Sequence, residues 1–246
     1  MSVIVPVMGT GATLRTPTGP PSADVVERIR SHWERLEQTF SLFRPGSELS
    51  RIARGEVALS SSGEEVRSAY AEALRWRELT DGDFTPHRPD GALDLSGTVK
   101  ARAIQDAGRM LDEVGLASWL VEIGGDVLTR APDRQTWSAG IADPHDVTRL
   151  LTGVDLGGRW RAIATSGTAE RGEHVWRSRQ HGRLVQVTVL GVDIMEVDVL
   201  ATAILAGGLP ALDAAGRRFD VDVLTVDAEG DLRVTPRLRR AITAPA

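Results

Sequence analysis

The sequence predicts an α+β fold in which mixed, largely antiparallel sheets are flanked by helices. Amphipathic segments with apolar residues at helical spacing mix throughout the chain with short β-branched segments. Tight turns rich in glycine join neighbouring strand candidates in the manner of hairpins. The 246 residues, 41% of them hydrophobic, are enough to bury a substantial core, and they contain no repeat or low-complexity tract.

The first third of the chain predicts a strand followed by three helices. The opening β-branched strand is interrupted at Met8-Gly9-Thr10. An amphipathic helix follows Ser22, the expected N-cap, and its apolar face consists of Val25, Ile29, Trp33, Leu36 and Phe40. Ser47 begins a short helix, and Ser61 or Ser62 caps a third one.

The rest of the chain alternates strands and helices. We expect a short strand at 92–95, a loop at 96–98 and a helix from about Val99 to Val114. Two further helices are expected at 195–208 and near 210–218. The remaining strand candidates are 119–123, 127–130, 137–141, 160–164, 184–190, 221–226 and 232–234.

Composition excludes several classes of function. The net charge of -5 argues against a nucleic-acid or anionic-membrane partner, because both require a concentrated basic surface. The absence of cysteine excludes disulfides and thiolate chemistry. The N-terminal residues do not resemble a signal peptide, and no segment approaches the roughly 18 apolar residues of a membrane span. We therefore expect a cytoplasmic protein without membrane insertion.

Asp198 and Thr202 are four residues apart at the start of a predicted helix, which places both on one face. A carboxylate and a hydroxyl are hard oxygen ligands of the kind that Mg²⁺ prefers. The alternative is that Asp198 caps the helix and Thr202 bonds to the preceding turn.

A second candidate site lies where a predicted strand ending at Asp94 leads through a loop containing Gly97 into a helix that carries Lys100. Lys100 is the only lysine in the sequence. Free N–H groups at a helix start and a nearby ammonium favour phosphate, and Asp94 could accept from a ribose or ring N–H. An ordinary strand–loop–helix junction explains the same pattern. Neither a Walker loop nor GxGxxG is present.

His174 is a candidate general acid or base near neutral pH, and Ser166 precedes it at the end of a predicted strand. A Ser-His-Asp triad is conceivable from these two residues, but no GxSxG nucleophile elbow is present. The alternative is that His174 is an exposed strand histidine. No HxH or HExxH spacing indicates zinc.

Taken in order, these segments resemble the ApbE family, the FAD:protein FMN transferases, from Met8 to about Gly208. The sequence segments that carry the resemblance are MGT at 8–10, SLF and SEL within 41–49, TDGDF at 80–84, LDLS at 93–96, KARA at 100–103, EIGGD at 122–126, ATSG at 164–167, HV at 174–175 and DVLAT at 198–202. So many short motifs in the family's order are improbable by chance.

The resemblance implies an ApbE-like, T-fold-related architecture and one flavin transferase domain over residues 1–246, with two subdomains around an FAD cleft as the alternative. It also implies an enzyme that cleaves FAD at its pyrophosphate, passes FMN to a Ser or Thr hydroxyl of an acceptor protein and releases AMP. Positioning and charge neutralisation by a metal dominate such phosphoryl transfers.

The resemblance also assigns roles to individual residues. Asp198 and Thr202 would hold Mg²⁺, joined by a backbone carbonyl near Gly97, with Asp198 serving catalysis through the metal. His174 would assist proton transfer at the acceptor hydroxyl. The residues that would line the flavin nucleotide are Met8, Phe43, Asp83, Phe84, Thr85, Asp94, Lys100 and Val175.

The segment WRSRQHGR after His174 differs from the D-P-x-T-G of the family. This difference favours two alternatives to transferase activity: a metal-dependent FAD pyrophosphatase that yields FMN and AMP, and a non-catalytic FAD-binding protein. The sequence does not identify the acceptor protein.

Overall fold

The structure is a computed structural model that describes residues 2–132, 135–167 and 184–242. Within these residues, eight strands form one antiparallel sheet in the order β1-β2-β3-β4-β7-β8-β9-β10, and β5 and β6 form a separate hairpin. The strands are β1 (Ser2–Val7), β2 (Thr10–Arg15), β3 (Trp119–Ile123), β4 (Asp126–Arg130), β5 (Trp137–Asp143), β6 (Asp146–Leu156), β7 (Ala162–Gly167), β8 (Leu184–Gly191), β9 (Asp222–Asp227) and β10 (Leu232–Val234).

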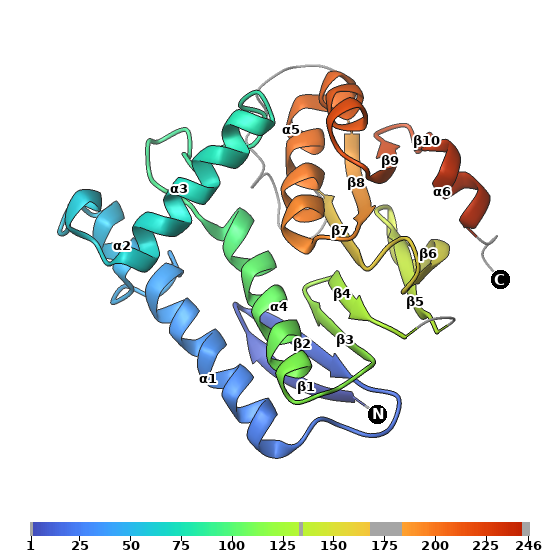
Figure 1. The fold of residues 1–246 in the computed structure, drawn as a ribbon. Helices are drawn as coiled ribbons and strands as arrows, with labels where there is room; N and C mark the ends of the chain where they lie inside the picture. The colour runs from blue at the N-terminus through green and yellow to red at the C-terminus, as the bar shows by residue number, and fades with distance from the viewer. Residues whose placement is uncertain (1, 133–134, 168–183, 243–246) are drawn as a thin grey trace.

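Helices cover one face of this sheet, as Figure 1 shows for α1, α4 and α5. The helices are α1 (Ala23–Phe40), α2 (Glu48–Ala53), the 3₁₀ helix η1 (Leu59–Ser61), α3 (Glu64–Leu79), α4 (Ser96–Glu113), α5 (Ile194–Arg218) and α6 (Pro236–Ala241). The predicted α+β class, with antiparallel sheets flanked by helices, is confirmed.

Alternate residues of the central strands pack on opposite faces of the sheet. Val121 and Val189 join the large core beneath the helices, whereas their neighbours Leu120 and Leu190 join a second core. The β5–β6 hairpin and α6 cover this second core with Ile141, Val154, Leu156 and Leu238. The period-2 pattern thus gives three layers: helices, the large sheet, and a thinner cover of hairpin and short helix.

The N-terminal helices follow their sequence pattern closely. The five apolar residues expected on one face of α1 are the buried residues of that helix. The Ser47 side chain caps α2 by accepting from the N–H of Ser50 at 3.0 Å. The prediction that Ser61 or Ser62 caps α3 is wrong, because Gly63 is the N-cap and the Glu48 carboxylate accepts its N–H.

The segment before α4 also differs from prediction. Residues 92–95 form no strand, and Leu93 makes only an isolated bridge with His87. The loop expected at 96–98 is the first turn of α4. The helix begins early because the Asp94 carboxylate accepts the N–H of Ser96 at 2.9 Å and the Leu95 carbonyl accepts the N–H groups of the next turn.

The helix α5 contains the two helices expected at 195–208 and 210–218. Gly208 interrupts it with a φ of 69° and a ψ of -153°, and Pro210 begins the second half. The helix is long and apolar enough to cross a membrane, but 78% of its most apolar window is buried inside the protein. It therefore packs as a core helix on β7 and β8, beside α4 (Figure 1).

The strand β6 and the helix α6 are not predicted by the sequence pattern. The first half of β6 is exposed, including its apolar residues Val147 and Leu150, so its sequence does not show one buried apolar face. Near α6, the fully buried Asp222 accepts from Trp160 Nε1 at 3.0 Å and Thr235 Oγ1 at 2.7 Å and pairs with Arg237 Nε at 3.2 Å. This network ties β9 to the chain on either side of it.

Asp106 on α4 gives the structure a pH-dependent contact. His32 Nε2 lies 2.8 Å from its Oδ2, and Arg109 donates to its Oδ1 at 3.2 Å. Burial alone would raise the pKa of Asp106, but these hydrogen bonds and charges outweigh burial and lower that pKa. A carboxyl whose pKa is lowered in the folded state stabilises the protein above its unfolded pKa of about 4, and this stability is lost as the pH falls through the folded pKa.

We expect Asp106→Asn to lower the free energy of unfolding by about 1 kcal/mol at pH 7, and the difference from wild type to shrink below about pH 4. Urea denaturation at pH 7 and pH 3 measures both differences. Asp213→Asn, which changes an exposed carboxylate on α5, is the control and leaves stability unchanged. A difference for Asp106→Asn that stays constant between the two pH values would contradict this explanation.

Candidate functional site

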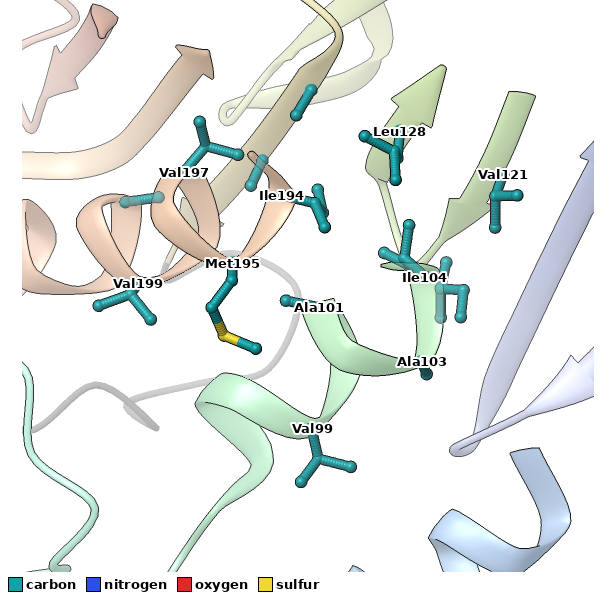
Figure 2. Close-up of a cluster of buried hydrophobic side chains, with 14 of the residues drawn as sticks. Val99, Ala101, Ala103, Ile104, Val121, Leu128, Ile194, Met195, Val197 and Val199 are labelled. Atoms are coloured by element: carbon teal, nitrogen blue, oxygen red, sulfur yellow. The ribbon is translucent and has the colours of Figure 1, made fainter. Parts of the chain in front are cut away.

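The candidate site lies where the start of α4 meets the first half of α5. Figure 2 shows Val99, Ala101, Ala103 and Ile104 of α4 in one buried cluster with Ile194, Met195, Val197 and Val199 of α5 and with Val121 and Leu128 of the adjacent strands. The small side chain of Ala101, which is fully buried, allows close packing of α4 here. This packing brings polar residues of α4, β4 and α5 together.

Lys100 of α4 pairs with a carboxylate from each of two other elements. Its Nζ contacts Asp126 Oδ2 at the start of β4 and lies 3.6 Å from Asp198 Oδ1 of α5. The Asp126 side chain has no exposed surface, and Asp198 is 3% exposed. Buried carboxylates require such partners, because an isolated charge is costly to remove from water.

The structure rules out the capping alternative for Asp198. Asp193 is the N-cap of α5, and its Oδ1 accepts from the N–H of Met195 at 2.8 Å and of Glu196 at 3.1 Å. Asp198 lies one turn further on, where its side chain has no helix end to cap. One turn beyond it, Thr202 Oγ1 lies 3.1 Å from Ser166 Oγ at the end of β7.

These oxygens form a donor set that fits Mg²⁺. Asp198 supplies a buried carboxylate, and Thr202 supplies a half-buried hydroxyl on the same face of α5. Among the described residues, no group of three or more His, Cys, Asp or Glu side chains could hold a metal. Mg²⁺ commonly binds one or two protein carboxylates and completes its shell with water and substrate phosphate oxygens, so this sparse set suits a metal shared with a phosphate-bearing ligand.

Met8 lies in the tight turn between β1 and β2 and has a φ of 48°, which is uncommon for a residue with a side chain. Its N–H donates to Glu37 Oε1 at 2.7 Å, and the other oxygen of Glu37 pairs with Arg44. Phe43, the neighbour of Arg44, is 94% exposed. Glu37 thus links two of the segments predicted to line the nucleotide.

Four other predicted lining residues lie between α3 and α4. Asp83 and Phe84 are buried, whereas Thr85 and Asp94 are half-buried. Gly97, predicted to offer a carbonyl to the metal, lies in the first turn of α4. A side chain at Gly97 would come within 2.9 Å of the Phe84 ring, so the ring covers the start of α4 closely.

Two predicted residues, His174 and Val175, lie outside the described residues, so the triad hypothesis for Ser166 and His174 remains a prediction. Sequence reasoning did not single out Asp126 or Glu37 as site residues. The signal for Asp126 is its position directly after the Gly124-Gly125 turn, whose positive φ angles of 56° and 87° bring β4 back beside β3. Glu37 has no comparable signal, because it follows the helical pattern as an ordinary polar residue.

A comparison with known families identifies the chain's relatives. The ApbE family matches residues 8–90 and 85–225. The chain belongs to the ApbE family.

Two curated relatives are named FAD:protein FMN transferase. The protein from Salmonella typhimurium is 28% identical over 159 residues, which cover 58% of this chain and 45% of that protein. The protein from Escherichia coli K12 is also 28% identical over 159 residues, which cover 58% of this chain and 44% of that protein. The matched segment thus spans about half the length of these curated relatives.

Solved ApbE structures share the fold over nearly the whole chain. The flavin transferase ApbE from Vibrio cholerae superposes with a TM-score of 0.75 at 21% identity, over 98% of both chains. The ApbE protein from Thermotoga maritima gives a TM-score of 0.79 at 19% identity, again over 98% of both chains. These similarities confirm the predicted ApbE-like architecture.

Gly207 of α5 leaves room for Asp83, one of the predicted lining residues. A Cβ at position 207 would lie 2.4 Å from Asp83 Cγ, whereas a Cβ at Gly216 of the same helix would meet nothing within 4 Å. We expect Gly207→Ala to lower the free energy of unfolding by about 1–3 kcal/mol through overpacking. Gly216→Ala, the control, should raise it by about 0.5–1 kcal/mol through helix propensity.

Guanidinium denaturation of both variants measures these changes. A Gly207→Ala protein as stable as Gly216→Ala would contradict the close contact between Asp83 and α5.

Proposed function

We propose that this protein is a Mg²⁺-dependent FAD:protein FMN transferase, which passes FMN from FAD to a Ser or Thr hydroxyl of an acceptor protein and releases AMP. The observation that carries the proposal is the oxygen pair of Asp198 and Thr202 on one face of α5, beside the buried Lys100 ion pair. The names of the curated relatives and the similarity to ApbE flavin transferases support the reaction.

In the proposed reaction, the acceptor hydroxyl oxygen forms a bond to the phosphorus of the FMN moiety, and the bond from that phosphorus to the AMP oxygen breaks. AMP leaves with the bonding electrons, and the hydroxyl proton passes to a base, for which His174 is the candidate. Mg²⁺, when bound, would neutralise negative charge on the pyrophosphate oxygens.

Asp198 and Thr202 would hold the metal, and a carbonyl near Gly97 stays the predicted third protein ligand. Lys100 pairs with two carboxylates, and its ammonium would supply positive charge to a bound pyrophosphate. The exposed ring of Phe43 offers an aromatic surface that a flavin ring would cover. The other proposed lining residues are Met8, Asp83, Phe84, Thr85, Asp94 and Val175.

The test is incubation of the protein with FAD, Mg²⁺ and candidate acceptor proteins that carry an accessible Ser or Thr. We expect AMP release together with a fluorescent flavin that stays on the acceptor through denaturing electrophoresis. Asp198→Asn and Thr202→Val should each reduce the rate by roughly tenfold to hundredfold or more, because each removes a proposed metal ligand.

Thr225→Val is the matched control for Thr202→Val. Thr225 is 1% exposed on β9, and its hydroxyl has no hydrogen-bond partner among the described residues. The control should therefore keep full activity. Rates for Thr202→Val and Asp198→Asn that equal the control would contradict the metal site.

The altered segment after His174 favours a second candidate, a metal-dependent FAD pyrophosphatase. Equal amounts of FMN and AMP, formed without any flavin on the acceptor, would support it. FAD binding without any AMP would instead indicate a non-catalytic FAD-binding protein. A cytoplasmic location also remains a prediction, which fractionation of the native host would test.

A further inference from the structure

Asp126 uses its two carboxylate oxygens for two different elements of the candidate site. Its Oδ1 accepts the N–H of Thr165 on β7 at 3.0 Å, and its Oδ2 contacts the ammonium of Lys100 on α4. The residue is fully buried as the first residue of β4. It therefore fixes the position of α4 and of the end of β7 at the same point.

The Lys100 ammonium has two possible carboxylate partners, and the structure shows which it prefers. It is in direct contact with Asp126 and lies 3.6 Å from Asp198, the proposed metal ligand. An ammonium in full contact with Asp198 would compete with a divalent cation for the same oxygens. It would also bring the net charge of Lys100 and Asp198 to zero, which disfavours a cation.

We propose that Asp126 is a positioning residue that draws the Lys100 ammonium away from Asp198 and so keeps the Asp198 carboxylate available to the metal. This inference rests on the proposed function, because it takes Asp198 as a metal ligand. Asp126 does not touch the metal; it sets the affinity of the site through Lys100.

The hydrogen bond that Asp126 accepts from Thr165 supports a second positioning role, at the end of β7. It holds the end of β7, where the next residue, Ser166, contacts the Thr202 hydroxyl at 3.1 Å. One buried carboxylate thus acts on both proposed ligands, on Asp198 through Lys100 and on Thr202 through β7. Such outer partners commonly orient the ligands of protein metal sites and tune their affinity.

Asp126→Asn tests the proposal, because the amide keeps an acceptor for Thr165 and loses the charge that attracts Lys100. The measurement is the Kd for Mn²⁺ alone, from the free-Mn²⁺ electron paramagnetic resonance signal, on full-length protein without FAD or acceptor. We expect the Kd to rise about tenfold to hundredfold. Circular dichroism and denaturation check that the variant is folded.

The decisive comparison repeats the substitution in a Lys100→Met protein. If Asp126 acts through Lys100, Asp126→Asn should change the Kd by less than roughly threefold in this background, since no ammonium remains to compete for Asp198. An equal loss of affinity with and without Lys100 would overturn the proposal. So would an unchanged Kd in the single variant.

Asp222→Asn is the matched control for loss of a buried, paired carboxylate. Asp222 is 1% exposed and pairs with Arg237 in the C-terminal network. This variant should lose stability, whereas its Kd for Mn²⁺ should equal that of wild type. If its Kd rose as much as that of Asp126→Asn, general destabilisation would explain both effects and the proposal would be overturned. A wild-type protein that binds no Mn²⁺ would overturn the metal site itself, whereas Mn²⁺ binding without FMN transfer would contradict only the reaction.

Discussion

The ion pair of Lys100 with Asp126 and Asp198 joins three elements that are far apart in the sequence, and the geometry of the candidate site depends on it. Lys100 comes from α4, Asp126 from the start of β4 and Asp198 from α5. Each carboxylate is almost completely buried, so it is stable there only while its partner stays in place. The resulting constraint holds one face of α5, with Thr202 one turn beyond Asp198, against α4 and the end of β7.

Close packing makes this constraint possible. The fully buried Ala101 and the contact of Gly207 with Asp83 allow α5 to approach α4 and the segment before it. The tight Gly124-Gly125 turn returns the chain so that Asp126 lies beneath the helices. The side chains proposed to bind phosphate and metal therefore lie on helices and strand ends, which hold them in fixed positions. Met8 and Phe43, which are proposed to contact the flavin nucleotide, lie in connecting segments instead.

The spacing of apolar and polar residues along the sequence predicts individual helices and the residues that share one face of a helix. The apolar spacing of α1 and the four-residue separation of Asp198 and Thr202 both follow from helix geometry. Local periodicity does not predict contacts between distant segments. Lys100 of α4 contacts Asp126 of β4 because α4 packs on the paired strands β3 and β4. Helix α4 begins earlier than the sequence predicts because the Asp94 carboxylate accepts the N–H of Ser96, which outweighs the loop signal of Gly97. The pattern does not predict β6 because the first half of this strand is exposed and so shows no buried apolar face.

In our proposal, Asp198 and Thr202 hold a divalent cation beside the Lys100 ion pair. The most direct measurement is anomalous diffraction from crystals of the protein grown with Mn²⁺ and FAD. We expect an anomalous peak about 2.0–2.3 Å from one oxygen of Asp198 and from Thr202 Oγ1, with pyrophosphate oxygens in the same shell. Crystals with bound FAD in which the Mn²⁺ peak lies away from both residues, or in which no peak is present, would contradict this metal site.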